Sequence, residues 1–179
     1  MKMEEYNQTG IYVGDIIKSA LDGDPECCYK LGKLVGTPSS RLYIPETPSG
    51  PEGMAYWFMK AADLGHTDAQ VDYAMLCIEG MGVSVNYAMA MKYLHMAASG
   101  ANPSSQAMTN IASLHSQGLG VPQDYLAARE WWLKAAERGS RQSMYALGIM
   151  YQNGRFGQPD QEDAHSDDRG QSNQSMAGS

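Results

Sequence analysis

Apolar side chains recur along residues 67–98 and 105–136 at steps of three and four positions, the spacing of one face of an α-helix. Each stretch contains two such segments, and a glycine-rich loop separates them. The first segment of the first stretch carries Ala69, Tyr73, Ala74 and Leu76, and the second carries Ala90, Tyr93, Leu94 and Ala97. The pattern therefore predicts pairs of short helices, each with a first and a second helix.

Two independent markers show that this pair is a repeating unit. A double alanine near the end of the second helix occurs at 61–62 and returns after 36 residues at 97–98 and after 38 more at 135–136. The loop Gly80-Met81-Gly82-Val83 returns after 38 residues as Gly118-Leu119-Gly120-Val121. One helix pair cannot bury its apolar stripe alone, so neighbouring pairs must stack. We therefore predict an all-α fold, a right-handed α/α solenoid of antiparallel helix pairs.

Capping residues agree with these helix limits. Gly65 and Gly139 follow second helices, where a left-handed residue commonly ends a helix. In the middle unit Ala101 takes that place, and we expect a remodelled turn there. The expected N-caps are Asp24, Thr67, Ser104 and Ser140 for the first helices and Asn86 and Asp124 for the second.

The best copy of the unit spans residues 107–139 and contains Gly118-Leu119-Gly120-Val121, Asp124-Tyr125, Ala128, Trp131, Lys134-Ala135-Ala136 and Gly139. This pattern resembles the Sel-one-like repeat family, a group of tetratricopeptide-like helical repeats, over about residues 15–155. The resemblance implies a solenoid of about three and a half units that acts as a scaffold for other proteins.

The chain divides into a short N-terminal arm at 1–10, the solenoid at 11–157 and an acidic tail at 158–179. A proline-rich insertion at 36–51 replaces the expected glycine loop of the first unit, and helix should resume near Glu52. The tail carries five acidic residues, one basic residue and almost no large apolar groups, so we expect it to be disordered. We further expect it to leave Ser143–Tyr151 partly uncovered and available for self-association.

The centre of the insertion is apolar, with Leu42, Tyr43 and Ile44 in succession. Long loops in compact domains are usually functional or disordered. We expect these three residues to dock on the solenoid or to form a partner-binding loop.

Composition limits the partners. The net charge of −7 argues against a nucleic-acid surface, and no apolar run approaches the roughly 20 residues that span a membrane. The start of the chain has no apolar signal segment. The three cysteines, Cys27, Cys28 and Cys77, lack the spacing of a disulfide framework or a metal site. We expect a cytoplasmic protein, with delivery to another cell without a cleavable signal left open.

No set of residues in the sequence points to catalysis, and we expect no catalytic, cofactor-binding or metal-binding residues. The four histidines, His66, His95, His115 and His165, share no pattern. Trp57, Tyr93 and Trp131 recur at one repeat position, as packing between units requires, and Trp132 beside Trp131 should be partly exposed.

A groove along the first helices is the candidate binding surface, because tetratricopeptide-like solenoids expose the first helices on their concave side. The residues change along the array from acidic through neutral to apolar, which suits a partner segment with a basic and an apolar part. The expected groove residues are Asp72, Met75 and Glu79, then Asn110, Ser113 and Gln117, then Tyr145, Ala146 and Ile149.

We therefore expect a non-enzymatic protein-interaction module, an adaptor or scaffold that binds another protein, with no nucleic acid, membrane or cofactor involved. Two alternatives stay open: a β-lactam-processing or amide-hydrolysing enzyme, and a bacterial effector directed at a host cell. Some secreted relatives in the family are associated with β-lactam binding, but this chain has neither their paired cysteines nor a Ser-x-x-Lys motif.

Overall fold

The computed structural model of the chain describes residues 13–37, 40 and 42–154. Over these residues the chain forms eight α-helices and no strand, which confirms the all-α prediction. The expected arm at 1–10 and the expected tail at 158–179 lie outside the described residues. The helices are α1 (Val13–Leu21), α2 (Pro25–Gly36), α3 (Gly50–Asp63), α4 (Thr67–Glu79), α5 (Tyr87–Ser99), α6 (Ser105–Gln117), α7 (Tyr125–Glu137) and α8 (Arg141–Gln152).

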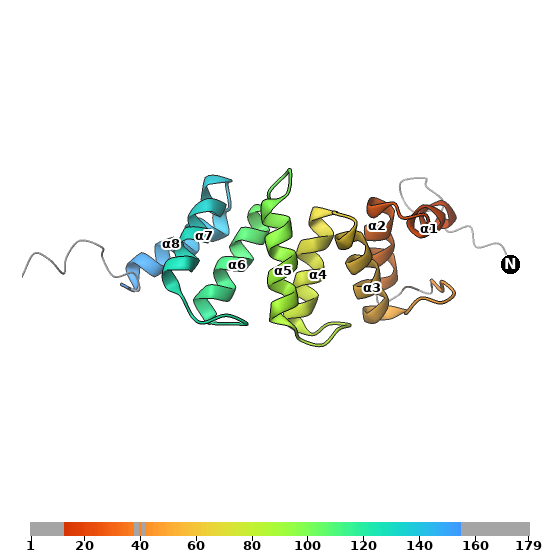
Figure 1. Cartoon of the computed structure of the whole chain (residues 1–179), viewed down its shortest axis with the longest axis horizontal. Helices are drawn as coiled ribbons and strands as arrows, with labels where there is room; N and C mark the ends of the chain where they lie inside the picture. Colours follow the sequence, from red (N-terminus) through yellow and green to blue (C-terminus); the bar gives the residue numbers. More distant parts are fainter. Residues whose placement is uncertain (1–12, 38–39, 41, 155–179) are drawn as a thin grey trace, which may run out of the picture.

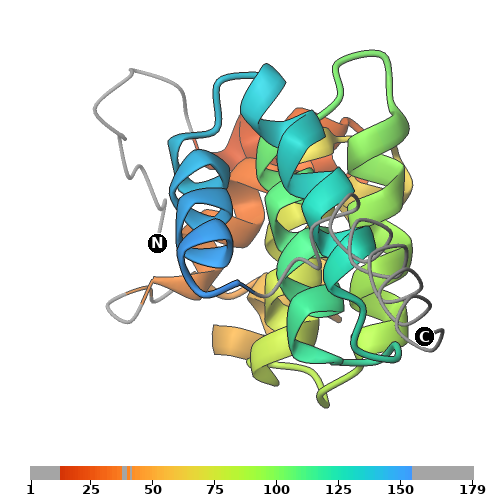
Figure 2. The same cartoon turned by 90° about the vertical axis from the view of Figure 1, so that its left-hand side faces the viewer.

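The helices follow one another along the long axis of the molecule, from α1 near one end to α8 at the other (Figure 1). The most extensive packing joins α2 with α3, α4 with α5 and α6 with α7, and each pair then packs on the next. The fold is therefore a solenoid of helix pairs, as predicted. Helix α8 takes the place of a first helix at one end of the described array, which Figure 2 views from that side.

Most predicted N-caps are confirmed, but one is displaced. Asp24 accepts a hydrogen bond from the Cys27 amide at 2.6 Å, and Asn86, Ser104, Asp124 and Ser140 cap their helices in the same way. The prediction for Thr67 is wrong, because Thr67 is already helical. The cap is His66, whose Nδ1 accepts from the Ala69 amide at 3.2 Å.

The glycine loops hold each unit against the preceding one. Gly80 and Gly118 end α4 and α6 in the left-handed conformation, with φ of 74° and 70°. The second glycine of each loop is also left-handed, and a Cβ there would collide with the preceding second helix, Gly82 with the Pro51 carbonyl and Gly120 with Tyr87. The second glycine is thus required both by its φ and by the close approach.

The turn between α5 and α6 is remodelled, as the sequence predicted. Gly65 and Gly139 end the neighbouring second helices with φ of 91° and 86°, but Gly100 is extended with φ −66° and ψ −179°. The Ser104 amide donates to the Ala97 carbonyl at 2.9 Å and closes the longer turn. The two additional residues are accommodated without loss of a capped helix.

The proline-rich insertion ends where helix α3 begins. Helix α3 begins at Gly50, near Glu52 as expected, and Pro51 is tolerated in its first turn, where the missing N–H has no intrahelical partner to lose. A Cβ at Gly53 would collide with the Pro48 carbonyl, so the end of the insertion lies directly on α3.

The aromatic residues fill the spaces between units, with one reversal of the prediction. Trp57 and Tyr93 are buried, as expected. Trp132 is buried, and Trp131 is only partly buried, although the sequence suggested the opposite. Trp132 packs with Leu147 and Met150 of α8, whereas Trp131 lies between α5 and α7 with its ring edge against His95.

Candidate functional site

Residues predicted to line the groove meet where α4 and α6 lie side by side. The Asn110 amide donates to the Met75 sulfur at 3.3 Å, so these two predicted residues are in contact across the boundary between units. Both are partly buried, and Glu79 and Gln117 at the ends of their helices are exposed. One side-chain contact therefore joins the predicted groove residues of two successive units.

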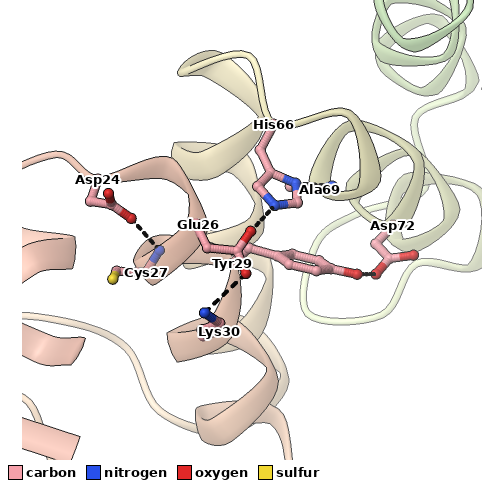
Figure 3. Close-up of polar contacts among 8 residues, drawn as sticks. All are labelled: Asp24, Glu26, Cys27, Tyr29, Lys30, His66, Ala69 and Asp72. Atoms are coloured by element: carbon pink, nitrogen blue, oxygen red, sulfur yellow. Dashed lines mark hydrogen bonds and ion pairs between the residues drawn. The ribbon is translucent and has the colours of Figure 1, made fainter. Parts of the chain in front are cut away.

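At the acidic end, Asp72 is held by a residue that sequence reasoning missed. The Tyr29 hydroxyl, from α2, donates to Asp72 Oδ2 at 2.8 Å (Figure 3). Burial, and then this hydrogen bond, raise the pKa of Tyr29 far above its usual value, so the phenol stays a donor at neutral pH. This hydrogen bond therefore connects α4, which carries Asp72, to α2, the first helix of the preceding unit.

A small polar network surrounds Tyr29 (Figure 3). His66 stacks on the Tyr29 ring with 4.4 Å between centroids, and its Nε2 lies 3.0 Å from Glu26. Because Nδ1 accepts from the Ala69 amide, Nε2 carries the proton and donates to Glu26. The hydrogen bond from His66, and then the neighbouring Lys30, lower the pKa of Glu26. The network joins α2 to the turn before α4.

The register of the repeats is the signal that could have identified Tyr29. In that register Tyr29 corresponds to Val71 in α4 and Thr109 in α6, both of which are buried between units. Thr109 in turn contacts the Ser143 hydroxyl of α8 at 2.8 Å. A tyrosine at this position must therefore find a polar partner on the next first helix, as Tyr29 does.

The middle of the predicted groove presents hydrogen-bond acceptors. Ser113 donates its hydroxyl proton to the Thr109 carbonyl, and Gln117 donates its amide to the Ser113 carbonyl. The Gln106 amide donates to Asn110 Oδ1 at 3.3 Å. Ser113 uses its hydroxyl proton and Gln117 uses one of its two amide protons within the helix, so the Ser113 hydroxyl oxygen and the Gln117 amide oxygen keep their capacity to accept hydrogen bonds.

At the apolar end the structure separates Tyr145 from the other two residues. Ala146 and Ile149 occupy the repeat positions of Asp72 and Met75 and continue the row. Tyr145 occupies the position of Thr109, which the next unit buries, and is itself 71% exposed. Tyr145 therefore lies on the end of the array and not in line with Ala146 and Ile149.

The predicted partner-binding loop is divided between the core and the surface. Ile44 is 4% exposed and Leu42 packs against the same core, so these side chains anchor the insertion to its own solenoid and are not available to a partner. Tyr43 is 72% exposed. Of the three predicted residues, Tyr43 is the one that a partner can reach.

The thiols lie in positions that favour their neutral form. Cys28 and Cys77 are buried, and burial raises the pKa of both, as it does for the partly buried Cys27.

Over residues 13–37, 40 and 42–154, no three His, Cys, Asp or Glu side chains lie close enough together to hold a metal ion. In the same part of the chain, no helix has both the length and the hydropathy needed to cross a bilayer.

Comparison with known proteins agrees with the repeat register. The family model described as Sel1 repeat matches residues 55–66, 67–102, 105–140 and 141–166. An uncharacterized protein of Neisseria meningitidis serogroup B is 34% identical over 104 residues, which cover 58% of this chain and 21% of that protein.

Two crystal structures are similar in fold. A Sel1 repeat protein from Oxalobacter formigenes superposes with a TM-score of 0.67 at 26% identity, covering 78% of this chain and 54% of that one. A protective antigen of uropathogenic Escherichia coli with an SLR fold has a TM-score of 0.55 at 24% identity, covering 80% of this chain and 37% of that one. The chain thus spans between a fifth and about half of the length of these proteins.

Proposed function

The chain belongs to the Sel1 repeat family, and from that premise we propose that it is a non-enzymatic adaptor that binds a segment of another protein along its first helices. Proteins of this family generally mediate protein–protein interactions. We call the proposed surface the groove row and define it by Asp72, Met75, Glu79, Asn110, Ser113, Gln117, Ala146 and Ile149.

The observation that carries the proposal is the contact between Met75 and Asn110. It brings a side chain of one first helix against a side chain of the next, which supports a surface shared by the two helices. The network from Tyr29 to Asp72 fixes the position of the acidic end before any ligand arrives. A surface that is already ordered lowers the entropy cost of binding.

The chemistry of the groove row suits a peptide segment with an uneven composition. Asp72 and Glu79 supply two carboxylates at one end, and Ala146 and Ile149 supply apolar contacts at the other. Between them, Ser113 and Gln117 offer oxygens to backbone or side-chain donors. The proposed ligand therefore has basic residues followed by polar and then apolar ones.

The test compares a bulky substitution in the groove row with one on a second helix. Ser113 is partly buried in the row, and Ala88 is exposed on α5. Proteins captured from a native extract by the unmodified chain would be identified, and the purified partner segment would be titrated against Ser113→Tyr and Ala88→Tyr. We expect at least a tenfold loss of affinity for Ser113→Tyr and no change for Ala88→Tyr.

A charge substitution tests the orientation of the segment. Glu79→Lys should weaken binding at low salt and have less effect as salt screens the charges. Equal affinity of the unmodified chain, Ser113→Tyr and Glu79→Lys would overturn the proposal that the partner lies in the groove row. No specific observation favours the enzyme alternative over this one.

We also propose that the protein acts in a reducing compartment, the cytoplasm being the simplest. The support is chemical, since Cys27, Cys28 and Cys77 are all free thiols. Cell fractionation followed by detection of the chain tests this location, and recovery of the chain outside the cytoplasmic fraction would contradict it.

A further inference from the structure

Four first helices share one register, and the last of them has a face that the others bury. Position by position, Met144, Tyr145 and Gly148 of α8 correspond to Met108, Thr109 and Ala112 of α6. The α6 residues are 7%, 1% and 0% exposed. In α8, Met144 is 51% and Tyr145 is 71% exposed, and Gly148 is also exposed. The positions that join one unit to the next are thus open at α8.

Helix α2 shows what this face requires, because it carries the same motif. Tyr29, Leu31 and Gly32 of α2 correspond to Tyr145, Leu147 and Gly148 of α8. A Cβ at Gly32 would lie 2.6 Å from the Phe58 ring, and the Tyr29 ring lies 5.2 Å from that same ring. The motif therefore receives an aromatic side chain from a neighbouring helix over its glycine.

At Gly148 that aromatic side chain is missing from the described part of the chain, since no atom lies within 4 Å of the place where a Cβ would be. In the repeat register, the positions of Trp131 and Trp132 fall on Asp167 and Asp168. Residues 155–179 contain Phe156, Ala164, Met176 and Ala177 as their apolar residues. This sequence does not offer the aromatic pair that covers the other units.

We propose that a second copy of this chain covers the face, with α8 of one copy packed against α8 of the other. We call the surface the terminal face and define it by Met144, Tyr145 and Gly148. In an antiparallel, two-fold arrangement that crosses at Gly148, each copy supplies a tyrosine to the glycine of the other. The terminal face thus contains both the aromatic side chain and the small position that receives it.

Charge also favours a second copy over a charged partner. Arg141, in the first turn, is the only Asp, Glu, Lys or Arg in α8, and Arg129 of α7 reaches α8 at Tyr151, one turn beyond Gly148. Met144, Tyr145 and Gly148 themselves carry no charge, so two copies of the terminal face place no like charges at the crossing point. The whole chain has a net charge of −7, which repels another copy at long range. Salt screens that repulsion, and association through the terminal face should therefore strengthen with salt.

The central experiment is sedimentation of the full chain over micromolar to near-millimolar concentrations. Two tyrosines of nearly equal exposure give a matched pair, Tyr145 at 71% on the terminal face and Tyr43 at 72% on the insertion. We expect the unmodified chain and Tyr43→Glu to form a species of twice the 19.5 kDa chain mass. Tyr145→Glu should weaken this dimer by at least tenfold while its helical circular dichroism stays unchanged.

A cysteine at the crossing point tests the geometry. In a Cys27→Ser background, Gly148→Cys should form a disulfide-linked dimer on mild oxidation, because the two residues 148 meet on the two-fold axis. The control is Ala88→Cys, exposed on α5 at a site that the proposed dimer does not contain.

Three results would overturn the proposal: an unmodified chain that stays monomeric at every concentration, a dimer that Tyr145→Glu leaves intact, or equal cross-linking through positions 148 and 88. Capture of a different protein by the terminal face of a monomeric chain would also overturn it. The groove row is not changed in any of these variants, so the proposed function and the dimer can fail separately.

Discussion

Helices α2 and α8 carry the same Tyr-x-Leu-Gly motif at the same repeat position, but among the described helices α2 packs against both α1 and α3, whereas α8 packs mainly against α7. Tyr29 of α2 stacks on His66, contacts Phe58 and donates to Asp72. Tyr145 of α8 is 71% exposed. The comparison shows that the environment of a residue in a repeat protein depends on its neighbouring unit as much as on its own helix.

The difference also separates what stabilises a unit from what recognises a partner. In α2 the motif contributes to the free energy of unfolding, because its tyrosine and glycine pack against another unit. In α8 the same side chains remain accessible, and a change there should alter association rather than stability. Substitutions at matched positions of the two helices can therefore test both statements.

The largest effect is expected for the aromatic ring that covers α2. Phe58 is 5% exposed and lies over both Tyr29 and Gly32. Phe58→Ala should lower the free energy of unfolding by about 3–5 kcal/mol, the range for truncation of a buried aromatic side chain. Tyr145→Ala should change it by less than about 0.5 kcal/mol, since that side chain is exposed. Denaturant unfolding followed by circular dichroism measures both.

A smaller effect, with opposite signs in the two helices, is expected for the glycines. Gly32→Ala introduces a Cβ against the Phe58 ring and the Trp57 Cβ, and should cost about 1–3 kcal/mol of overpacking, partly offset by the higher helix propensity of alanine. Gly148→Ala meets no atom of residues 13–37, 40 or 42–154 within 4 Å and should stabilise the chain by up to about 1 kcal/mol.

These glycine variants should be compared at low micromolar concentration, where association through the terminal face contributes least. Stabilisation by both substitutions would show that the Phe58 ring moves aside without cost. Destabilisation by both would show that α8 is covered in solution by a segment that the described residues do not include. Either outcome would remove the contrast between α2 and α8.

The next effect concerns the tyrosine hydroxyl alone. Tyr29→Phe removes the hydrogen bond to Asp72 and leaves a carboxylate without that donor, and should cost about 1–1.5 kcal/mol. Tyr145→Phe should be neutral within about 0.5 kcal/mol. Thermal unfolding of the two variants side by side measures the difference, and equal shifts would mean that the bond to Asp72 contributes nothing to stability.

Much of this fold could be predicted from the sequence, because each repeat contains the same kinds of helix-ending glycine and helix-capping residue. The Gly80 and Gly118 loops and the caps at Ser104 and Ser140 each serve one recognisable local role, and the structure confirms them. His66 was missed as a cap because the residue after it, Thr67, is the more usual capping type. Local chemistry therefore predicts the helices but does not choose between neighbouring candidates.

Contacts between units were harder to predict than the units themselves. Which of Trp131 and Trp132 is buried depends on the angle at which α7 meets α8, and a helical period cannot supply that angle. Tyr145 was assigned to the groove because it lies off the apolar packing stripe of its helix, whereas it shares the register of Thr109, which the next unit buries. For the candidate site, the row of first-helix residues stays a prediction, and the supporting Tyr29 was missed although the repeat register places it at a position that later units bury.

The smallest predicted effect is a pH dependence of stability that arises in α2 and not in α8. Helix α2 contains Glu26, which pairs with Lys30 and accepts a hydrogen bond from His66, whereas α8 contains no acidic residue. The hydrogen bond from His66 lowers the pKa of Glu26, so the folded chain binds fewer protons there than the unfolded chain. This contribution is present above the ordinary pKa of 4.5 and is lost as the pH falls through the lowered value.

The Glu26 side chain is 56% exposed, so solvent screening limits the contribution to a few tenths of a kcal/mol. Glu26→Gln should therefore reduce slightly the loss of stability between about pH 6 and about pH 3. In His66→Asn, which keeps a good N-cap but removes the hydrogen bond to Glu26, the same Glu26→Gln change should have a smaller effect. A double-mutant cycle of unfolding free energies at both pH values measures this coupling. Identical Glu26→Gln effects with and without His66 would assign the lowered pKa to Lys30 instead, and the hydrogen bond from His66 to Glu26 would then not contribute to the link between α2 and the turn before α4.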